Sequence, residues 1–419
     1  MQMIRPSEPI IIVGAGQAGV RAALALREQG YDGSLLLIGD EPQLPYERPP
    51  LSKQVLLGSR EPDQCTIGGA DLFLEQDIRL LTGVRVERIR REISSIALDD
   101  GATLAYSKLL LATGGRVRTV TVQGAGLAGV HYLRTIEDAL QLKAQLLPGQ
   151  RVVVVGGGFI GLEVAASARA LGCSVTVLEA GERLAARALP PQLSEKLLQL
   201  HRARGVDVQL QSRIEAFAGT TAVQAVALED GRNVPCDMIV VGIGIAPNVE
   251  LAVEAGLAVV NGIQVNHRLQ TSDEHIYAVG DVCEFPSALT GRTMRLETWR
   301  NAEEQGKHVA RTLLGYDEHF AALPWFWSDQ FDYSLQIAGE PHMAVHCIER
   351  PLADDGLLIF FLNEQLQLVA ACGWGRGNSI AKDIKIAEIL IKARRTIAHE
   401  ALADPAVGLK SLLKGTSDA

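Results

Sequence analysis

A glycine-rich turn between two apolar runs constrains the fold of this chain more than any other feature. The run Ile10–Val13 leads directly into Gly14, Gly16 and Gly19, in the pattern G-x-G-x-x-G of "IIIVGAGQAGV". Apolar residues at helical spacing come next, followed by a second apolar run and then Asp40. The first glycine suits a tight turn, the second lets the backbone approach a diphosphate, and the third lets helix and strand pack closely. This order predicts a dinucleotide-binding β-α-β unit.

The same unit occurs a second time. Val152–Val155 leads into Gly156, Gly158 and Gly161, and a later apolar run ends at Glu179. Two dinucleotide sites in one chain indicate FAD, held noncovalently, together with a nicotinamide nucleotide. A carboxylate at the end of the second strand bonds a free 2′-hydroxyl and repels a 2′-phosphate, so Glu179 predicts NADH rather than NADPH.

Three further apolar segments end in glycine-containing turns and mark places where the chain passes from one domain to another: Lys108–Arg116, Asp237–Asn248 and Thr271–Val282. From Pro324 the chain is rich in aromatic residues and then alternates in a way typical of antiparallel strands. We predict an α/β protein with two Rossmann-like dinucleotide-binding domains and a C-terminal α+β domain with an antiparallel sheet. The predicted domains are an FAD-binding domain made of two segments (1–115 and 248–323), an NAD-binding domain inserted between them (116–247) and a C-terminal domain (324–419).

Composition excludes several other classes of protein. The net charge of −9 argues against a nucleic-acid binder. No apolar run approaches the roughly 18 residues of a membrane span, and no signal peptide is recognised, so a cytoplasmic protein is expected. The six cysteines form no C-x-x-C and no metal-ligand spacing, so buried or inert thiols and no metal are expected. A monomer or weak homodimer is expected.

Several longer motifs make the chain resemble one family. They include "GAGQAGV", "PYERPPLSK", "LRTIEDA", "VVGGGFIGLEVAA", "RLETW" and "PWFWSDQ". The chain resembles, over nearly its whole length, the FAD-dependent NADH:ferredoxin reductases that serve bacterial Rieske oxygenases and cytochromes P450. The resemblance implies a glutathione-reductase-like fold.

The resemblance also implies roles for individual residues. Lys53 and Glu163 are implied to be catalytic, with Lys53 approaching the flavin ring and Glu163 beside the nicotinamide. Residues implied to contact FAD are Gly14, Gly16, Ala18, Gly19, Asp40, Arg48, Lys53, Val86, Arg134, Asp281, Trp299 and Trp327. Residues implied to contact NADH are Gly158, Ile160, Gly161 and Glu179. Further cofactor contacts are expected at Thr113, Gly156 and Gly244.

The prolines of "PYERPPLSK" suggest how Lys53 is presented. Proline fixes φ and restricts the residue before it, so we expect a stiff, extended lead-in at Pro49 and Pro50. With little entropy to lose, an ammonium held there stabilises negative charge on a reduced flavin, and Glu163 is its expected partner. The alternatives are an exposed loop lysine and a solvated helix carboxylate.

The acceptor is inferred from what the chain lacks. Related folds pass electrons through a cysteine pair, and peroxide-reducing relatives need a cysteine where "PPLSK" stands. Neither is present. We therefore expect electrons to pass from NADH through FAD, singly, to an acidic [2Fe–2S] ferredoxin that supplies a Rieske oxygenase or cytochrome P450. The alternatives are an NADH oxidase or monodehydroascorbate-type reductase, and a redox-responsive interaction protein like the apoptosis-inducing factor.

Two basic segments are candidate docking sites for such an acidic partner. The segment "GRTMRLETWR" carries Arg292, Arg295 and Arg300, and it is favoured because Trp299 is implied to line the flavin site. The segment "RGNSIAKDIKIAEILIKARR" carries six Lys and Arg residues against two acids, and its alternative interpretation is a solvated helix face.

Overall fold

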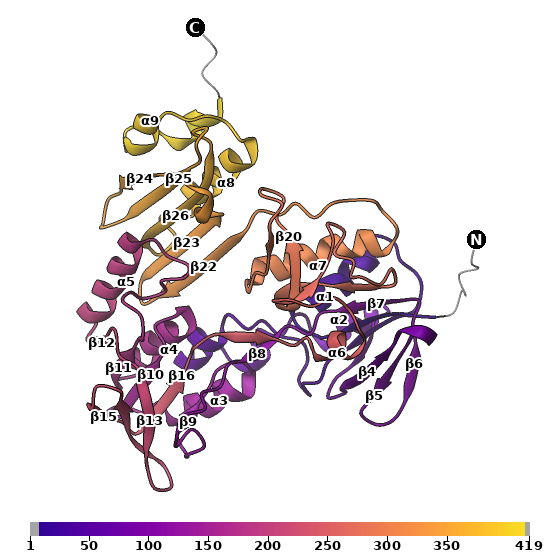
Figure 1. Cartoon of the computed structure of the whole chain (residues 1–419), viewed down its shortest axis with the longest axis horizontal. Coiled ribbons are helices and arrows are strands. Elements are labelled where there is room, and N and C mark those ends of the chain that lie inside the picture. The colour runs from indigo at the N-terminus through magenta and orange to yellow at the C-terminus, as the bar shows by residue number, and fades with distance from the viewer. Residues whose placement is uncertain (1–7, 415–419) are drawn as a thin grey trace. The chain divides into compact units, whose positions relative to one another are not determined.

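The computed structural model describes residues 8–414. The chain divides into two compact units, each built from separated stretches of sequence. The first unit holds the described residues up to Pro49 with Glu61–Arg116 and Ile245–Ala322, and the second holds Pro50–Arg60, Val117–Gly244 and the described residues from Leu323 onward. The colours of Figure 1 follow the chain through these stretches. The domain division expected from the sequence is finer than this one and stays a prediction.

A parallel sheet forms the centre of the first unit. Its strands are β1 (Ile10–Val13), β2 (Leu35–Ile38), β3 (Arg79–Leu81), β7 (Lys108–Leu111) and β19 (Ile276–Ala278). They are arranged in the order β19-β7-β1-β2-β3, and all four pairings are parallel. Every residue of β1 and β2 is buried, as expected for a parallel sheet covered on both faces.

The helices of the first unit pack on this sheet and on each other. They are α1 (Gln17–Glu28), α2 (Ala70–Glu75), α6 (Glu250–Glu254) and α7 (Trp299–Leu313). A Cβ atom on Gly306 of α7 would lie 2.7 Å from the carbonyl oxygen of Ala18, so a glycine is needed where α7 crosses α1.

The chain also forms three smaller sheets in these stretches. Their strands are β4 (Val86–Arg90), β5 (Ser95–Leu98) and β6 (Thr103–Ala105) in one sheet; β8 (Gly115–Val117) and β17 (Ile245–Pro247) in another; and β18 (Ile263–Gln264), β20 (Cys283–Pro286) and β21 (Thr293–Met294) in the third.

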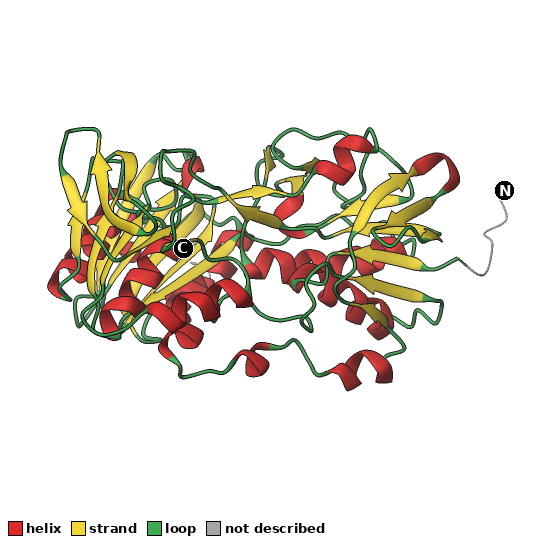
Figure 2. Cartoon of the chain, turned by 90° about the horizontal axis from the view of Figure 1, so that it is seen from below, coloured by secondary structure: helices red, strands yellow, loops and turns green. Residues whose placement is uncertain are grey.

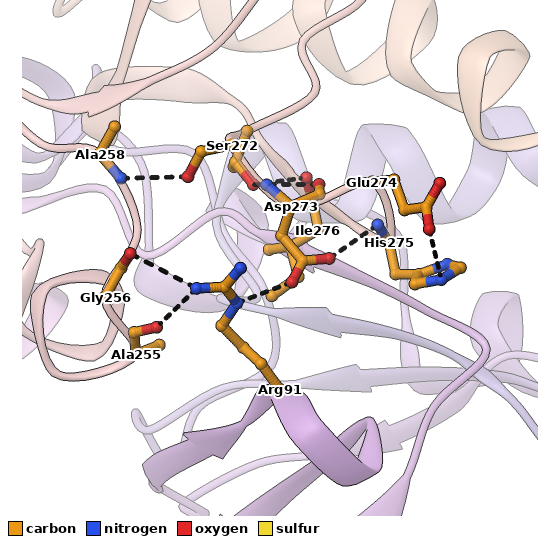
Figure 3. Close-up of polar contacts among 10 residues, drawn as sticks. Arg91, Ala255, Gly256, Ala258, Ser272, Asp273, Glu274, His275 and Ile276 are labelled. Atoms are coloured by element: carbon orange, nitrogen blue, oxygen red, sulfur yellow. Dashed lines mark hydrogen bonds and ion pairs between the residues drawn. The ribbon is translucent and has the colours of Figure 1, made fainter.

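The β4–β6 sheet is tied to the rest of the first unit through Arg91 (Figure 3). Its Nε lies 2.7 Å from Asp273 Oδ2, and its Nη1 donates to the carbonyl oxygens of Ala255 and Gly256. Asp273 Oδ1 also accepts from the backbone N–H of His275 at 2.9 Å. Burial by itself would raise the pKa of Asp273, but the His275 amide and Arg91 outweigh it, so the pKa is lowered.

A second parallel sheet and its helices belong to the second unit. The strands are β9 (Val130–His131), β10 (Arg151–Val155), β11 (Ser174–Leu178), β12 (Asp207–Gln209) and β16 (Met238–Val241), in the order β12-β11-β10-β16-β9. The helices are α3 (Ile136–Gln145), α4 (Phe159–Ala170) and α5 (Pro191–Ala203). The same unit contains an antiparallel sheet of β13 (Ile214–Gly219), β14 (Val223–Leu228) and β15 (Asn233–Pro235).

The stretch around the two prolines differs from the extended lead-in that we expected. Pro50 has φ −67° and ψ −21°, and Leu51–Val55 forms a single π-helical turn. The fixed φ of proline is compatible with the first turn of a helix, where its missing N–H leaves no bond unmade. The prolines therefore start a helical turn, and Lys53 projects from it.

The C-terminal region of the second unit contains an antiparallel sheet (Figures 1 and 2). Its strands are β22 (Trp325–Gln330), β23 (Tyr333–Gly339), β24 (His346–Pro351), β25 (Leu357–Leu362) and β26 (Leu368–Arg376), in the order β22-β23-β26-β25-β24. The helices are α8 (Ala381–Ala393) and α9 (His399–Ala403). A Cβ atom on Gly373 would lie 3.0 Å from Ile380 and 3.1 Å from Ile384, so this glycine lets the start of α8 approach the sheet. The predicted fold class is confirmed. Within residues 8–414 we find no helix with the length and apolar character of a membrane span.

Removing the Arg91 guanidinium should destabilise the first unit. We expect Arg91→Ala to lower its free energy of unfolding by about 1–2 kcal/mol at neutral pH, because Asp273 loses a charged donor. A carboxyl group with a lowered pKa contributes stability above its unfolded-state pKa of about 3.9, and loses it as the pH falls through the folded-state value. The difference between wild type and variant in urea denaturation should therefore shrink between pH 7 and about pH 3.

Arg116→Ala is the control for this experiment. Arg116 pairs with Glu250 in the same unit, but the two side chains are 55% and 57% exposed, so less than about 1 kcal/mol should be lost. Equal losses in the two variants, or a loss in Arg91→Ala that does not change with pH, would contradict the role given to Arg91.

Candidate nucleotide and redox sites

The three glycines of the first loop differ in how closely other atoms surround them. Gly14 has φ +111°, and a Cβ atom there would lie 2.2 Å from the carbonyl oxygen of Ala112. A Cβ atom on Gly19 would lie 1.9 Å from the carbonyl oxygen of Gly14. In contrast, a Cβ atom on Gly16 would meet no atom within 4 Å. The outer two glycines are therefore needed by the fold, whereas the middle one keeps open the space that a diphosphate would occupy.

The second loop repeats this pattern in the other unit. A Cβ atom would lie 2.5 Å from the Gly242 carbonyl oxygen if placed on Gly156, and 2.4 Å from the Gly156 carbonyl oxygen if placed on Gly161. On Gly158 its nearest neighbour would be 3.9 Å away. Both loops open helices of 12 residues, α1 and α4, with no side-chain cap and no acidic residue in the first turn. Such helix starts favour an anion, so both loops fit the diphosphate of a dinucleotide.

The acids that follow the two loops occupy different positions. Glu179 Oε2 accepts from the N–H of Gly157 and its Oε1 from the N–H of Gly181, each at 2.7 Å, so the carboxylate is held against the second loop. The register pairs Val13 with Ile38 in the first sheet and Val155 with Leu178 in the second. The position equivalent to Glu179 in the first sheet is therefore Gly39. Asp40 lies one residue further on and is exposed.

Arg48 belongs to a polar cluster that the motifs alone did not lead us to expect. Its Nη2 lies 2.5 Å from Glu41 Oε1, and its Nη1 donates to the hydroxyl of Tyr46 at 3.0 Å. The Tyr46 hydroxyl in turn donates to Glu41. Burial lowers the pKa of Arg48, but Tyr46, Glu41 and Asp281 outweigh it, so the pKa is raised and the group is cationic. Tyr46 lies inside the motif "PYERPP", so this motif could have indicated the cluster.

Asp281 follows a turn that is fixed by α7. The N–H of Gly280 donates to Gln305 Oε1 at 2.7 Å, and a Cβ atom on Gly280 would lie 3.1 Å from Ala18. The structure thus brings Ala18 next to the turn that carries Asp281. The carbonyl oxygen of Asp281 accepts from Arg295 Nη1 at 3.0 Å.

This contact corrects the expectation for the first basic segment. The Arg295 side chain is only 8% exposed and also pairs with Glu297 at 2.7 Å. An arginine that is buried and bonded inside its own unit is not available to a docking partner. Arg292 is exposed, whereas Trp299 and Arg300 are partly buried.

The other residues implied by the resemblance are distributed over both units. In the first unit, Val86 is buried at the start of β4, and Thr113 Oγ1 donates to the carbonyl oxygen of Asn248 at 2.8 Å. The second unit holds the rest. The backbone N–H of Arg134 donates to Asp138 before α3, Ile160 is 49% exposed in the first turn of α4, Gly244 adopts φ +100°, and Trp327 stacks on Trp325 with ring centroids 5.4 Å apart.

Lys53 and Glu163 form a buried ion pair in the second unit. Their Nζ and Oε2 atoms lie 2.9 Å apart, and the side chains are 15% and 3% exposed. Glu163 Oε2 also accepts from the Ser52 hydroxyl at 2.5 Å, and its Oε1 accepts from the Ser328 hydroxyl at 2.6 Å. The exposed lysine and the solvated carboxylate considered above are therefore both excluded. A buried carboxylate with three donors is the environment in which a buried charge is tolerated.

The cysteines offer no redox pair. None of the six forms a disulfide, and five of them are buried, whereas Cys347 is exposed. Burial raises the pKa of the Cys236 thiol to about 11, so this thiol is protonated at neutral pH. Within the described residues of the chain, no group of three His, Cys, Asp or Glu side chains is placed to hold a metal ion.

Comparisons with known proteins agree with this architecture. The family model for pyridine nucleotide-disulphide oxidoreductases matches residues 8–306, and the reductase C-terminal model matches residues 325–413. The chain is 44% identical to the ferredoxin–NAD(+) reductase component of the anthranilate 1,2-dioxygenase system of Burkholderia cepacia, over 97% of this chain and 100% of that protein. It is 37% identical to putidaredoxin reductase of Pseudomonas putida, over 97% of each chain.

Solved structures give the same answer. The ferredoxin reductase for the CYP199A2 system from Rhodopseudomonas palustris superposes with a TM-score of 0.93, at 37% identity, covering 97% of this chain and 100% of that one. The covalent putidaredoxin reductase–putidaredoxin complex gives a TM-score of 0.93, again at 37% identity, covering 97% of this chain and 98% of that one. The resemblance drawn from the sequence motifs is confirmed, and the chain belongs to the pyridine nucleotide-disulphide oxidoreductase family, with the reductase C-terminal domain at its end.

Proposed function

We propose that this protein is an NADH-dependent flavoprotein reductase that delivers electrons, one at a time, to a [2Fe–2S] ferredoxin serving a Rieske oxygenase or a cytochrome P450. The observation that carries the proposal is the pair of glycine loops, in each of which only the middle glycine faces open space. Two such loops suit one resident and one exchanging dinucleotide.

The residues around each loop suggest which nucleotide it takes. The loop Gly14–Gly19, with Ala18, Arg48 and Asp281, would hold FAD. The loop Gly156–Gly161, with Glu179 and the exposed Ile160, would hold NADH. FAD, when bound, accepts two electrons with a hydride and gives them up singly. The protein contributes binding, orientation and electrostatics.

The ion pair in the second unit supplies electrostatics of the required kind. The Lys53 ammonium is mostly buried, and the Glu163 carboxylate keeps it charge-balanced in the resting protein. A fixed cation of this kind stabilises negative charge that develops on a reacting group, because it needs no reorganisation at the moment of reaction. We infer that Lys53 serves the flavin in this way.

The ferredoxin as acceptor rests on the relatives. Their names describe ferredoxin–NAD(+) reductase components and putidaredoxin reductase, and one solved structure is a complex of that reductase with putidaredoxin. We extend this acceptor class to the present chain. The six cysteines include no closely spaced pair in the sequence, which suits direct transfer from the flavin.

The acceptor is tested by steady-state turnover. With NADH as donor, cytochrome c reduction should be slow with the protein alone and should rise at least about tenfold when a [2Fe–2S] ferredoxin is added. The ferredoxin should be chosen from a bacterial oxygenase system. If no such ferredoxin changes the rate of cytochrome c reduction, and O₂ or a small acceptor is consumed rapidly, the oxidase-type alternative would be favoured.

The carboxylate of Glu179 should set the preference between nucleotides. We expect kcat/KM for NADH to exceed that for NADPH by at least about tenfold, and Glu179→Ala to narrow this gap, because a 2′-phosphate no longer meets a negative charge. Glu182→Ala, a nearby surface acid, should leave the ratio unchanged. A wild-type enzyme that prefers NADPH would refute the assignment.

Lys53→Met should slow reduction of the bound flavin by NADH more than it weakens NADH binding. One fixed donor of this type contributes roughly 3 kcal/mol in other enzymes, which corresponds to a rate loss of about 150-fold. Rapid mixing with NADH, followed by absorbance, measures the step directly. Lys196→Met is the control, because Lys196 pairs with Asp355, a side chain that is 69% exposed. Equal reduction rates in both variants would return Lys53 to a structural role.

The second basic segment is the better docking candidate. Lys382, Lys385 and Lys392 are exposed along α8 at helical spacing, and Ile389 is 47% exposed between them. Lys382→Glu with Lys392→Glu should raise the KM for an acidic ferredoxin severalfold and leave NADH–ferricyanide activity unchanged. Arg88→Glu with Arg90→Glu, on exposed positions of β4, makes the same change in net charge. If both pairs of reversals act alike, or if salt has no effect on turnover, α8 is not the docking surface.

A further inference from the structure

A line of buried polar side chains extends from Glu163 into the C-terminal sheet. The Ser328 hydroxyl lies 2.6 Å from Glu163 Oε1, and Gln330 Nε2 lies 3.1 Å from Ser328 Oγ. Gln330 Oε1 lies 2.6 Å from His201 Nε2. All four residues are at most 3% exposed. Every member belongs to the second unit.

Three elements supply this line, and each supplies it for a local reason. Glu163 projects from α4 and His201 from α5, whereas Ser328 and Gln330 are two residues apart on β22 and so share one face of the strand. Phe326, the next residue on that face, packs on Phe159 of α4 with ring centroids 4.4 Å apart. Trp325 and Trp327 alternate onto the opposite face. The aromatic contact therefore fixes β22 against α4 with its polar side chains toward Glu163.

The direction of each hydrogen bond follows from the first one. The Glu163 carboxylate, paired with Lys53, can only accept, so the Ser328 hydroxyl donates to it. Ser328 Oγ then accepts from the amide nitrogen of Gln330, which turns the Gln330 oxygen toward His201. His201 must therefore carry its proton on Nε2. All of these donors point toward the carboxylate, and hydrogen bonds aligned in one direction polarise one another.

His201 ends the line as a neutral ring. Its Nδ1 atom is buried and has no hydrogen-bond partner among the described residues. Burial lowers the pKa of His201 to about 4, and the bond to Gln330 offsets this only in part. The rings of His201 and Phe331 lie at 64° to one another with centroids 5.3 Å apart, and the charges of Arg204 and Asp332 are paired with each other. The imidazole is therefore a fixed neutral donor at physiological pH.

We propose that Ser328, Gln330 and His201 are positioning residues that hold the Glu163 carboxylate in place and set how strongly it compensates the Lys53 ammonium. When these hydrogen bonds are weakened, they offset less of the negative charge of Glu163, so Lys53 has to balance more of it. Less of the lysine's positive potential then acts on its surroundings, so a group served by Lys53 becomes harder to reduce. This inference rests on the proposed function for its kinetic consequence, but the arrangement of the line itself does not.

The kinetic test compares two glutamines of the same sheet. Gln330→Leu removes the donor to Ser328, whereas Gln336→Leu replaces a buried glutamine on β23 that is outside the line. Gln330→Leu should slow flavin reduction by NADH about fivefold or more with less than about a twofold change in KM, since the second glycine loop is untouched. The flavin midpoint potential should move to a more negative value. Gln336→Leu should do neither, and equal effects of the two variants would overturn the proposal.

A hydroxyl rescue keeps the proposal testable if Gln330→Leu does not fold. Ser328→Ala removes the donor to Glu163 Oε1, whereas Ser328→Thr retains a hydroxyl at the same position. The alanine variant should show the slower reduction and the more negative potential, and the threonine variant should recover most of both. Matching behaviour of the two variants would mean that the hydroxyl has no positioning role.

A spectroscopic test does not depend on the enzyme being a reductase. In the full-length protein labelled with ¹⁵N-histidine, one ring, assigned by its loss in His201→Gln, should show the neutral Nε2–H tautomer and no titration between about pH 5.5 and pH 8. In Gln330→Leu its Nε2–H signal should move, because its acceptor is gone. A protonated or titrating His201 in the wild type would contradict the proposed line of hydrogen bonds. If the spectra agree while NADH does not reduce the wild-type protein, it is the proposed function that fails.

Discussion

The burial of one carboxylate organises the second unit. Glu163 lies within α4 at 3% exposure, and a charge so placed requires donors on both of its oxygens. The donors come from the helical turn after Pro50 and from β22. Removing any one of them would leave a charge buried with too few partners, a larger loss than the value of a surface ion pair. The positions of these separate elements around α4 are therefore coupled through a single functional group.

The two glycine loops show how one backbone solution serves two sites with different needs. In each loop one outer glycine is required by contact with a carbonyl of the loop itself and the other by contact with the residue after a neighbouring strand, Ala112 after β7 or Gly242 after β16, and only the middle one is left facing open space. The acids that follow have diverged. Glu179 is bonded to the N–H of Gly157, whereas the equivalent position in the first sheet is Gly39, where a Cβ atom would lie 2.7 Å from Ala15. An acid that serves the first site would have to be Asp40, one residue further on, or belong to the Glu41–Arg48 cluster.

Local features of the sequence predicted the fold well. The glycine loops, the buried strands and the alternating strands of the C-terminal sheet can each be recognised from a window of about 20 residues, because each depends on residues that are close in sequence. The pairing of Lys53 with Glu163 came from resemblance, since no spacing rule connects them. Ser328 and Gln330 were missed because the hydrogen bond between Glu163 and Ser328 spans 165 positions of sequence. Arg295 was wrongly expected to be available on the surface, because a count of charges does not reveal that its side chain already donates to the backbone carbonyl of Asp281.

The order of the stretches along the chain also limits how the protein can be made. The carboxylate of Glu163 takes one donor 111 positions before it and another 165 positions after it. The ribosome has therefore synthesised most of the chain before β22 emerges. Until then, Glu163 Oε1 has no hydrogen bond from Ser328. During synthesis water must therefore take the place of this serine, and the Phe159 ring of α4 lacks the Phe326 ring that packs on it. A chain that stops short of β22 would leave Glu163 hydrated and α4 without the strand that packs on it, so the second unit is completed only when the C-terminal sheet is made.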